Sequence, residues 1–302
     1  MATFLTLTIN GLALAAIFFL VSAGLSLIFG LMGVLNFAHG SFVVWGAYVW
    51  LAVFNDSGNF WLALLAAGLA GAAMGAITER VFIRPLYGRP QTQILVTLGL
   101  GLVLGQAVVV IWGESPQYFN AIPGLDGTLQ HGDLYIATYR LFVIGAGLVI
   151  LLAVWALLRL TRIGLIVRAG VENPTMTRAL GININLVFLG VFSLGSALAA
   201  LGGAVYAPYL SVTTPDMGQS MLLFAIVVVV LGGLGSYLGS ALGALIIGLA
   251  QDYVPFYISK FSMLPPNVAS SAASLISLAL LVGILLWRPQ GLLGLRWPGG
   301  AL

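Results

Sequence analysis

Residues 30–48, GLMGVLNFAHGSFVVWGAY, decide the fold because they place polar groups inside an otherwise apolar run. Within six residues the stretch carries Asn36, His39 and Ser41, and glycines lie on both sides of the first two. An unpartnered polar side chain in hydrocarbon is costly, so these groups must face protein or water. Glycine lets helix backbones approach closely in a membrane. The stretch therefore predicts a short or interrupted helix near residues 31–41, inside a packed helix bundle.

The composition of the whole chain is that of a membrane protein. Of its 302 residues, 61% are hydrophobic and 6% are charged, whereas a soluble domain carries roughly 25% charged residues. Only helices and closed barrels satisfy their backbone groups in lipid, and the long continuous apolar runs argue against a barrel. We expect an all-α polytopic membrane protein, with residues 1–302 forming a single transmembrane domain. The chain has no cysteine, which excludes disulfides and thiolate metal sites.

Apolar runs along the chain predict eight or nine transmembrane helices. The uncertainty lies near residues 230–240, where a glycine-rich segment fits either a turn between two short spans or a kink in one helix. The runs lie near residues 7–29, 34–54, 60–82, 92–112, 140–160, 184–206, 219–235, 237–254 and 267–287. Between the fourth and fifth runs, residues 113–139 predict an outer loop with a short hairpin or an interfacial helix.

The placement of arginines predicts the orientation, because cytoplasmic loops carry an excess of basic residues. With the amino terminus outside, nine crossings put the carboxyl terminus in the cytoplasm. The inner loops then hold nine of the 11 basic residues, namely Arg80, Arg84, Arg89, Arg159, Arg162, Arg168, Arg178, Arg288 and Arg296. Arg140 and Lys260 are the exceptions. The outer loops collect the acidic residues Asp56, Glu114, Asp126, Asp133, Asp216 and Asp252.

A weak internal repeat relates two glycine-rich segments. LMGVLNFAHGS, residues 31–41, aligns with VLGGLGSYLGS, residues 230–240, and the alignment places Gly33 on Gly232 and Gly40 on Gly239. Transporters often carry interrupted helices at related positions in two halves. We therefore expect a short or interrupted helix near 230–240 as well as near 31–41.

Two roles are open for the polar residues of the opening stretch. Asn36 and His39 are three residues apart and share one face of a helix. They could pin a broken helix, or they could line a translocation path or its gate together with Gly40 and Ser41. A metal site is disfavoured, because the only other histidine, His131, falls in an outer loop and no carboxylate lies near His39.

Energy for transport is expected to come from outside this chain. Aspartate, glutamate and lysine are absent from the middle of every predicted span, although ion-coupled carriers usually keep ionisable groups there. The G-x-x-x-x-G-K-[ST] nucleotide loop is also absent. An intramembrane protease built on Ser236 and His39 lacks the G-x-S-x-G elbow. We assign no catalytic residue and no cofactor, so the chain is either a channel or a transporter driven by a partner.

The inner loop RIGLIVRAGVENPTMTRALGIN, residues 162–183, predicts a short amphipathic helix over 166–180. It could dock into a cytoplasmic partner or rest on anionic lipid headgroups. Asn173-Pro174 marks a helix start or break. The polar residues assigned to this coupling loop are Arg168, Glu172, Asn173, Arg178 and Gly181, and its apolar residues are Ile166, Val167, Met176 and Leu180.

Several of these segments together resemble one family. The opening stretch, ERVFIRPLYGR, RAGVENPTMTRALGIN, VVVLGGLGSYLGSALGALIIGLAQ and RPQGLLG are similar to the Liv-type permeases of branched-chain amino-acid ABC transporters, in particular the smaller H-type subunit. The resemblance implies an importer permease in the bacterial inner membrane. It also implies a second homologous permease, two cytoplasmic ATPase subunits and a periplasmic binding protein as partners, with 162–183 as the cytoplasmic coupling helix.

The resemblance does not specify the substrate, because the same family includes permeases for urea, short amides and aromatic acids. A passive channel for a small neutral solute such as urea is the alternative from a different class. The inner loop distinguishes the two functions, because a channel has no need of it. The net charge of +3 is not taken as a sign of nucleic-acid binding, because the location of arginines matters more in a membrane protein.

Overall fold

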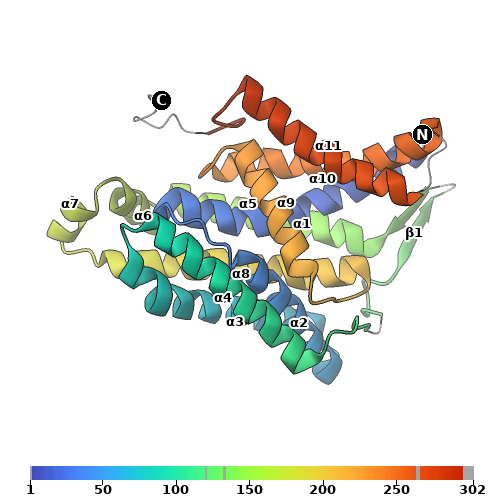
Figure 1. Cartoon of the computed structure of the whole chain (residues 1–302). Helices are drawn as coiled ribbons and strands as arrows, with labels where there is room; N and C mark the ends of the chain where they lie inside the picture. The colour runs from blue at the N-terminus through green and yellow to red at the C-terminus, as the bar shows by residue number, and fades with distance from the viewer. Residues whose placement is uncertain (1, 120, 132–133, 263–265, 295–302) are drawn as a thin grey trace.

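A computed structural model describes the chain except residues 1, 120, 132–133, 263–265 and 295–302. The described part is a bundle of helices with one small hairpin (Figure 1). Each of the nine predicted spans corresponds to a helix. These helices are α1 (Ala2–Met32), α2 (His39–Ser57), α3 (Phe60–Thr78), α4 (Pro90–Trp112), α5 (Thr138–Leu160), α8 (Ile184–Leu210), α9 (Met217–Gly232), α10 (Tyr237–Ser262) and α11 (Pro266–Trp287).

Six stretches of the described chain are long and apolar enough to cross a membrane: α1, α3 with its continuation to Leu86, α4, α5, α8 and α10. The continuation of α3 is a π-helical turn, η1 (Glu79–Ile83), followed by a 3-10 turn, η2 (Arg84–Leu86). The apolar helix α9 has 16 residues, which at 1.5 Å per residue is about 24 Å and less than the roughly 30 Å hydrocarbon core. The prediction of an all-α polytopic membrane protein is confirmed.

The predicted inner loops gather at one end of the bundle. The helices α6 (Arg162–Glu172) and α7 (Pro174–Ala179) lie at this end, and the amino terminus and the hairpin lie at the other (Figure 1). Hydrogen bonds tie the segment after α11 to the end of α9, through Leu292 to Leu231 and Leu293 to Gly232. The end of α9 lies on the side of α6 and α7, so the described end of the chain and the start of α1 lie at opposite ends of the bundle (Figure 1). An odd number of crossings has this consequence. Arg296 and Asp133 lie outside the described residues.

The first interruption falls where the sequence predicts it. Gly33, with φ +65°, ends α1, and residues 33–38 run without regular structure to the start of α2. The segment is largely enclosed, since Val34, Asn36 and Ala38 are at most 1% exposed. Irregular backbone is tolerated at membrane depth only where protein or a water-filled cavity surrounds it. Here protein covers Val34, Asn36 and Ala38, whereas Gly33 at the start of the segment is exposed and Leu35 and Phe37 are half-buried.

The second interruption has a different form. Residues 233–236 make a tight turn between α9 and α10, with φ of +106° at Gly233 and +78° at Gly235. The two helices form an antiparallel hairpin in which Gly232 and Gly239 are backbone to backbone. The choice between a turn and a kink is therefore settled in favour of a turn. Gly30, near the end of α1, contacts Gly235, so the two interruptions lie next to each other in space.

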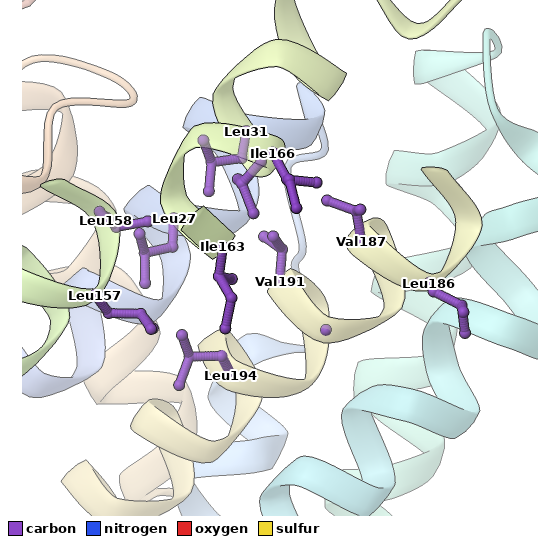
Figure 2. A pocket seen from close by; sticks show the side chains of 12 residues that line it. Leu27, Leu31, Leu157, Leu158, Ile163, Ile166, Leu186, Val187, Val191 and Leu194 are labelled. Atoms are coloured by element: carbon purple, nitrogen blue, oxygen red, sulfur yellow. The ribbon is translucent and has the colours of Figure 1, made fainter. Parts of the chain in front are cut away.

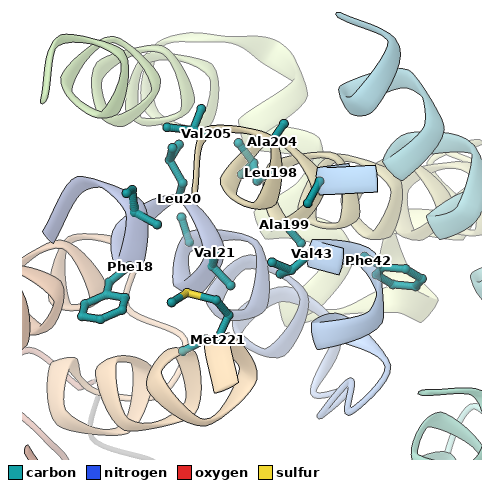
Figure 3. Close-up of a cluster of buried hydrophobic side chains, with 14 of the residues drawn as sticks. Phe18, Leu20, Val21, Phe42, Val43, Leu198, Ala199, Ala204, Val205 and Met221 are labelled. Carbon is teal, nitrogen blue, oxygen red and sulfur yellow. The ribbon is translucent and has the colours of Figure 1, made fainter. Parts of the chain in front are cut away.

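The core is built around α1, which packs against α8, α9, α10 and α5. Figure 3 shows Leu20 and Val21 of α1 beside Val43 of α2 and Leu198 of α8. Small residues set how closely these helices approach. A Cβ at Gly203 of α8 would overlap the Val43 carbonyl oxygen.

The outer loop 113–139 contains a hairpin, which is one of the two predicted forms. Strands β1 (Thr128–His131) and β2 (Leu134–Ala137) pair antiparallel, with Thr128 opposite Ala137. The same loop is tied to the α8–α9 connection by two backbone hydrogen bonds of 2.9 Å between Gln117 and Thr213. These bonds join two loops at the end of the bundle opposite α6 and α7.

One sequence expectation is wrong: Asp252 is not in an outer loop. The helix α10 extends to Ser262, beyond the apolar run that ends near 254, so Asp252 lies within it and is partly buried. Arg140, an exception to the predicted charge distribution, lies close enough to interact electrostatically with Asp252. Arg140 also donates a hydrogen bond to Asn10 and lies over the ring of Tyr209, 5.7 Å from its centre. Local polar partners thus explain both departures.

We expect Gly203→Ala to lower the thermal stability of the purified protein clearly, because the new methyl group must push α8 and α2 apart. Gly145→Ala in α5 is the matched control, since nothing lies within 4 Å of its Cβ position. The control should leave stability unchanged or raise it slightly, as alanine favours helix. Melting temperatures in detergent measure both. Equal melting temperatures for the two variants would contradict the close approach of these helices.

Candidate functional site

The polar residues of the opening stretch lie at the junction of the interrupted segment and α2. The Asn36 side-chain oxygen accepts a hydrogen bond of 3.1 Å from the Ala38 backbone, and the Asn36 carbonyl accepts one of 3.2 Å from the His39 backbone. Asn36 therefore holds the turn from which α2 begins. This behaviour is typical of asparagine, whose short side chain bonds to nearby backbone.

His39 connects the start of α2 to the middle of α1. Its Nε2 atom lies 2.9 Å from the Val21 carbonyl oxygen, and the ring is fully buried. A carbonyl only accepts, so we assign the proton to Nε2. The His39 ring also lies where Gly24 meets Gly195 of α8, and a Cβ at Gly24 would come within 3.0 Å of the ring. His39 thus sits where α1, α2 and α8 meet.

Ser41 and Gly40 continue these contacts to two further helices. The Ser41 hydroxyl donates a bond of 2.7 Å to the Gly101 carbonyl of α4, and Trp45 donates one of 2.9 Å to Leu104 one turn later. On another side, Gly40 is backbone to backbone with Gly218 of α9. The structure brings all four predicted site residues together at one junction.

Two polar atoms at this junction have no described hydrogen-bond partner. They are the Asn36 Nδ2 and the His39 Nδ1 atoms, both buried. Each can bond to a water molecule or to a polar group that reaches it after a change of conformation. The junction therefore combines a structural pin with unused hydrogen-bonding capacity. Among the described residues, no group of three or more His, Cys, Asp or Glu side chains could hold a metal ion.

A second polar cluster, not assigned a role from the sequence, lies at the arginine-rich end. Glu79 is fully buried and accepts hydrogen bonds from Arg84 at 3.1 and 2.7 Å and from Tyr87 at 2.7 Å. Burial raises the pKa of the Tyr87 hydroxyl above its ordinary value, so the phenol stays protonated and donates. Arg84 also donates to the Asn185 carbonyl at 3.3 Å. The cluster ties the end of α3 to the start of α8.

The sequence carried a signal for this cluster in ERVFIRPLYGR. A glutamate at the end of an apolar run, followed five residues later by an arginine, allows the two side chains to form a buried ion pair. The pairing needs the π-helical turn of η1, since this turn adds a residue to the helix and sets Arg84 back over Glu79. That local geometry is not visible in the residue pattern.

The predicted coupling segment is two helices rather than one. The break falls at Asn173, whose side chain accepts a bond of 2.9 Å from Met176 and caps α7. Thr177 bonds back to the Ala169 carbonyl at 2.9 Å, which holds α7 against α6. Gly181, with φ +84°, follows the end of α7. Asn173-Pro174 marks the break, as the sequence suggests.

Docking of a single helix would require the four apolar residues of this segment to share one face, and they do not. Ile166 and Val167 turn toward the bundle, where they line a cavity beside α8, and Val167 is 5% exposed. Met176 and Leu180 are 59% and 73% exposed. Arg168 donates a hydrogen bond to the Leu158 carbonyl, while Arg178 is exposed. The side chain of Glu172 lies outside the described residues.

The fold and these sites define a multi-pass membrane protein with an interrupted helix at its core and a surface helix pair at its basic end. The sequence model of the family described as "Branched-chain amino acid transport system / permease component" matches residues 7–285. The chain belongs to this family and is a permease component of a transport system.

Three relatives illustrate the range of similarity. The high-affinity branched-chain amino acid transport system permease protein LivH of Escherichia coli K12 is 30% identical over 308 residues, covering 96% of each chain. The corresponding permease BraD of Pseudomonas aeruginosa is 28% identical over 299 residues, covering 95% of this chain and 94% of BraD. The ribose import permease RbsC of Escherichia coli K12 is 30% identical over 249 residues, covering 77% and 73%. No solved structure matches the chain.

We expect His39→Leu to lower the stability of the permease by about 1–3 kcal/mol, since it leaves the buried Val21 carbonyl without its side-chain donor. His39→Gln is the matched variant, because its amide can donate in the same direction and should recover part of the loss. Denaturation of the purified chain measures both. Leucine and glutamine variants with wild-type stability would contradict the pinning role.

We expect Arg84→Met to destabilise the protein by about 3 kcal/mol, because it leaves the Glu79 carboxylate buried and unpaired. The double variant Arg84→Met with Glu79→Gln should be more stable than Arg84→Met alone. Tyr87→Phe removes one hydrogen bond and should cost about 1 kcal/mol. If the effects of Arg84→Met and Glu79→Gln simply add in the double variant, the two residues are not a coupled pair.

Proposed function

We propose that this chain is a permease subunit of an ATP-binding-cassette importer for branched-chain amino acids or a related small solute. In this proposal it resides in the bacterial inner membrane with its arginine-rich end in the cytoplasm. A second homologous permease completes the translocation path, two ATPase subunits supply energy, and a periplasmic binding protein delivers the solute. Membership of the family, over residues 7–285, is the observation that carries the proposal.

The helix α7 supplies the surface for the ATPase. Met176 and Leu180 present exposed apolar side chains away from the bundle, and Arg178 is exposed between them. Methionine and arginine are enriched in protein interfaces relative to the rest of the surface, and an exposed leucine beside them adds apolar area to bury. Because nothing in the sequence binds nucleotide through a P-loop, force from ATP must enter through such a contact.

From α7 the structure offers a short mechanical route to the core. Gly181 and the capping residue Asn183 lead directly into α8, which packs against α1, α2 and α3. The cluster of Glu79, Arg84 and Tyr87 fastens α3 to the start of α8. In this proposal a push on α7 moves α8 and α3 together, and α8 carries the movement to α1 and α2 at the His39 junction.

The junction at Asn36 and His39 is the proposed hinge of the translocation path. Its backbone is already irregular, so a change of angle between α1 and α2 breaks few helical hydrogen bonds. The free Nδ atoms of both residues can form new bonds in a second conformation. In this proposal Gly40 and Ser41 guide the start of α2 along α9 and α4. The alternative of a passive urea channel finds no support among the relatives, whose names describe branched-chain amino acid transport and ribose import.

The test replaces Met176 and Leu180 together by serine and measures co-purification of the ATPase and solute uptake by reconstituted vesicles. Burying such a side chain is worth about 1.5–3 kcal/mol, so losing two should abolish stable co-purification. Leu65→Ser in α3 is the control, because Leu65 is as exposed as Met176, at 59%, but lies on another helix. Normal uptake by the double variant would contradict the proposed contact.

A further inference from the structure

The cavity behind α6 is a separate feature that the proposed transport function does not use. It has a volume of about 330 Å³, and its lining is almost entirely apolar. Figure 2 shows how it is built. Leu27 and Leu31 of α1 and Leu157 and Leu158 of α5 line one side, and Ile166 of α6 lies beside Leu31.

The cavity exists because two helices share a neighbour but scarcely touch each other. Both α5 and α8 pack on α1, and they make few mutual contacts. The space between them is closed at the basic end by α6, which Thr161 caps through a 3.3 Å bond from Gly164. Val191 and Leu194 of α8 line the other side.

The cavity is open to the surroundings of the bundle. Ile163 and Leu186 stand at its rim and are 59% and 63% exposed. In a protein that crosses the membrane, an apolar opening between two spanning helices faces acyl chains rather than water. The occupant suited to such a space is therefore hydrocarbon.

Three arginines lie next to lining residues of this cavity. Arg159, in the last turn of α5, follows Leu158, and Arg162, the first residue of α6, precedes Ile163. Arg168 donates a hydrogen bond to the Leu158 carbonyl, and all three arginine side chains are exposed. From Arg159 to Ala200 the sequence has a single acidic residue, Glu172. Positive charge beside an apolar space complements a molecule with an anionic head and an apolar tail.

We infer that this cavity binds one acyl chain of an anionic phospholipid, with the phosphate headgroup held by Arg159, Arg162 and Arg168. Guanidinium groups suit phosphate because they donate paired hydrogen bonds. The lipid would fill the gap between α5 and α8 and support α6 from beneath. Met176 of α7 and Leu180, which follows that helix, remain free for a protein partner. The inference rests on the membrane location of the chain and not on the proposed ATPase contact.

The test measures lipid retained by the full-length protein after purification in mild detergent, using native mass spectrometry and vesicles of phosphatidylglycerol or phosphatidylcholine. The wild type should retain phosphatidylglycerol in preference to phosphatidylcholine. Gly190→Phe should fill the cavity and displace the lipid, since Gly190 lines it and nothing lies within 4 Å of its Cβ position. Gly145→Phe, also with open space at its Cβ, is the control and should retain the lipid.

The double variant Arg159→Gln with Arg162→Gln should weaken phosphatidylglycerol affinity roughly 30-fold, the effect expected of two arginines near an anionic lipid. Arg80→Gln with Arg89→Gln removes two exposed arginines of the α3–α4 connection and should leave lipid retention unchanged. Unchanged retention by Gly190→Phe, equal retention of both lipids by the wild type, or loss of a co-purifying protein instead of lipid would each overturn the inference.

Discussion

The structure depends on one constraint: the irregular backbone of residues 33–38 must be enclosed by protein. Unpaired backbone groups cannot face lipid, so every neighbour of this segment must come close. Gly101 of α4 lies against the Phe37 and Ala38 backbone, and Thr97 of the same helix donates a hydrogen bond to the Leu35 carbonyl. Beside the segment, Gly24, Gly195 and Gly218 let α1, α8, α9 and α2 approach closely. Asn36 then accepts a bond from the Ala38 backbone within the segment, and His39 ties the start of α2 to the Val21 carbonyl in the middle of α1. In the opening stretch, the glycines allow close helix packing and the polar residues form the hydrogen bonds that hold the interrupted segment in place.

At the arginine-rich end, α3 is held firmly to α8, whereas α6 is held more loosely to the bundle. The buried carboxylate of Glu79 holds α3 to α8 through Arg84, whereas α6 crosses a cavity with few contacts beneath it. In α6, Ile166 and Val167 turn toward the bundle, whereas Met176 of α7 and Leu180 after it are exposed. In the proposed importer, the firm connection transmits movement from α7, and a lipid beneath α6 keeps that helix in place.

Much of the fold could be predicted from the sequence because long apolar runs and arginine-rich loops are local signals. Helices over the apolar runs and the interruption at 31–41 follow from such signals. The sequence left two points open: whether 230–240 is a turn or a kink, and whether 113–139 forms a hairpin or an interfacial helix. The extent of α10 around Asp252 could not, since the partners Arg140 and Tyr209 come from other helices. Ile166 faces the bundle and Met176 is exposed because of the way α6 packs beside α8. This packing is a tertiary contact that the residue pattern does not reveal. For the same reason, ERVFIRPLYGR contributes to the family resemblance, but the ion pair of Glu79 with Arg84 is known only from the structure.

The most direct measurement of the central claim is an electron cryo-microscopy structure of the assembled transporter in a lipid nanodisc. We expect non-helical density for residues 33–38 against α4, with the His39 ring against the Val21 carbonyl in at least one conformation. We also expect Gly24 and Gly195 to remain in backbone contact. A continuous helix through residues 31–57, or a His39 ring separated from α1 in every conformation, would contradict this claim.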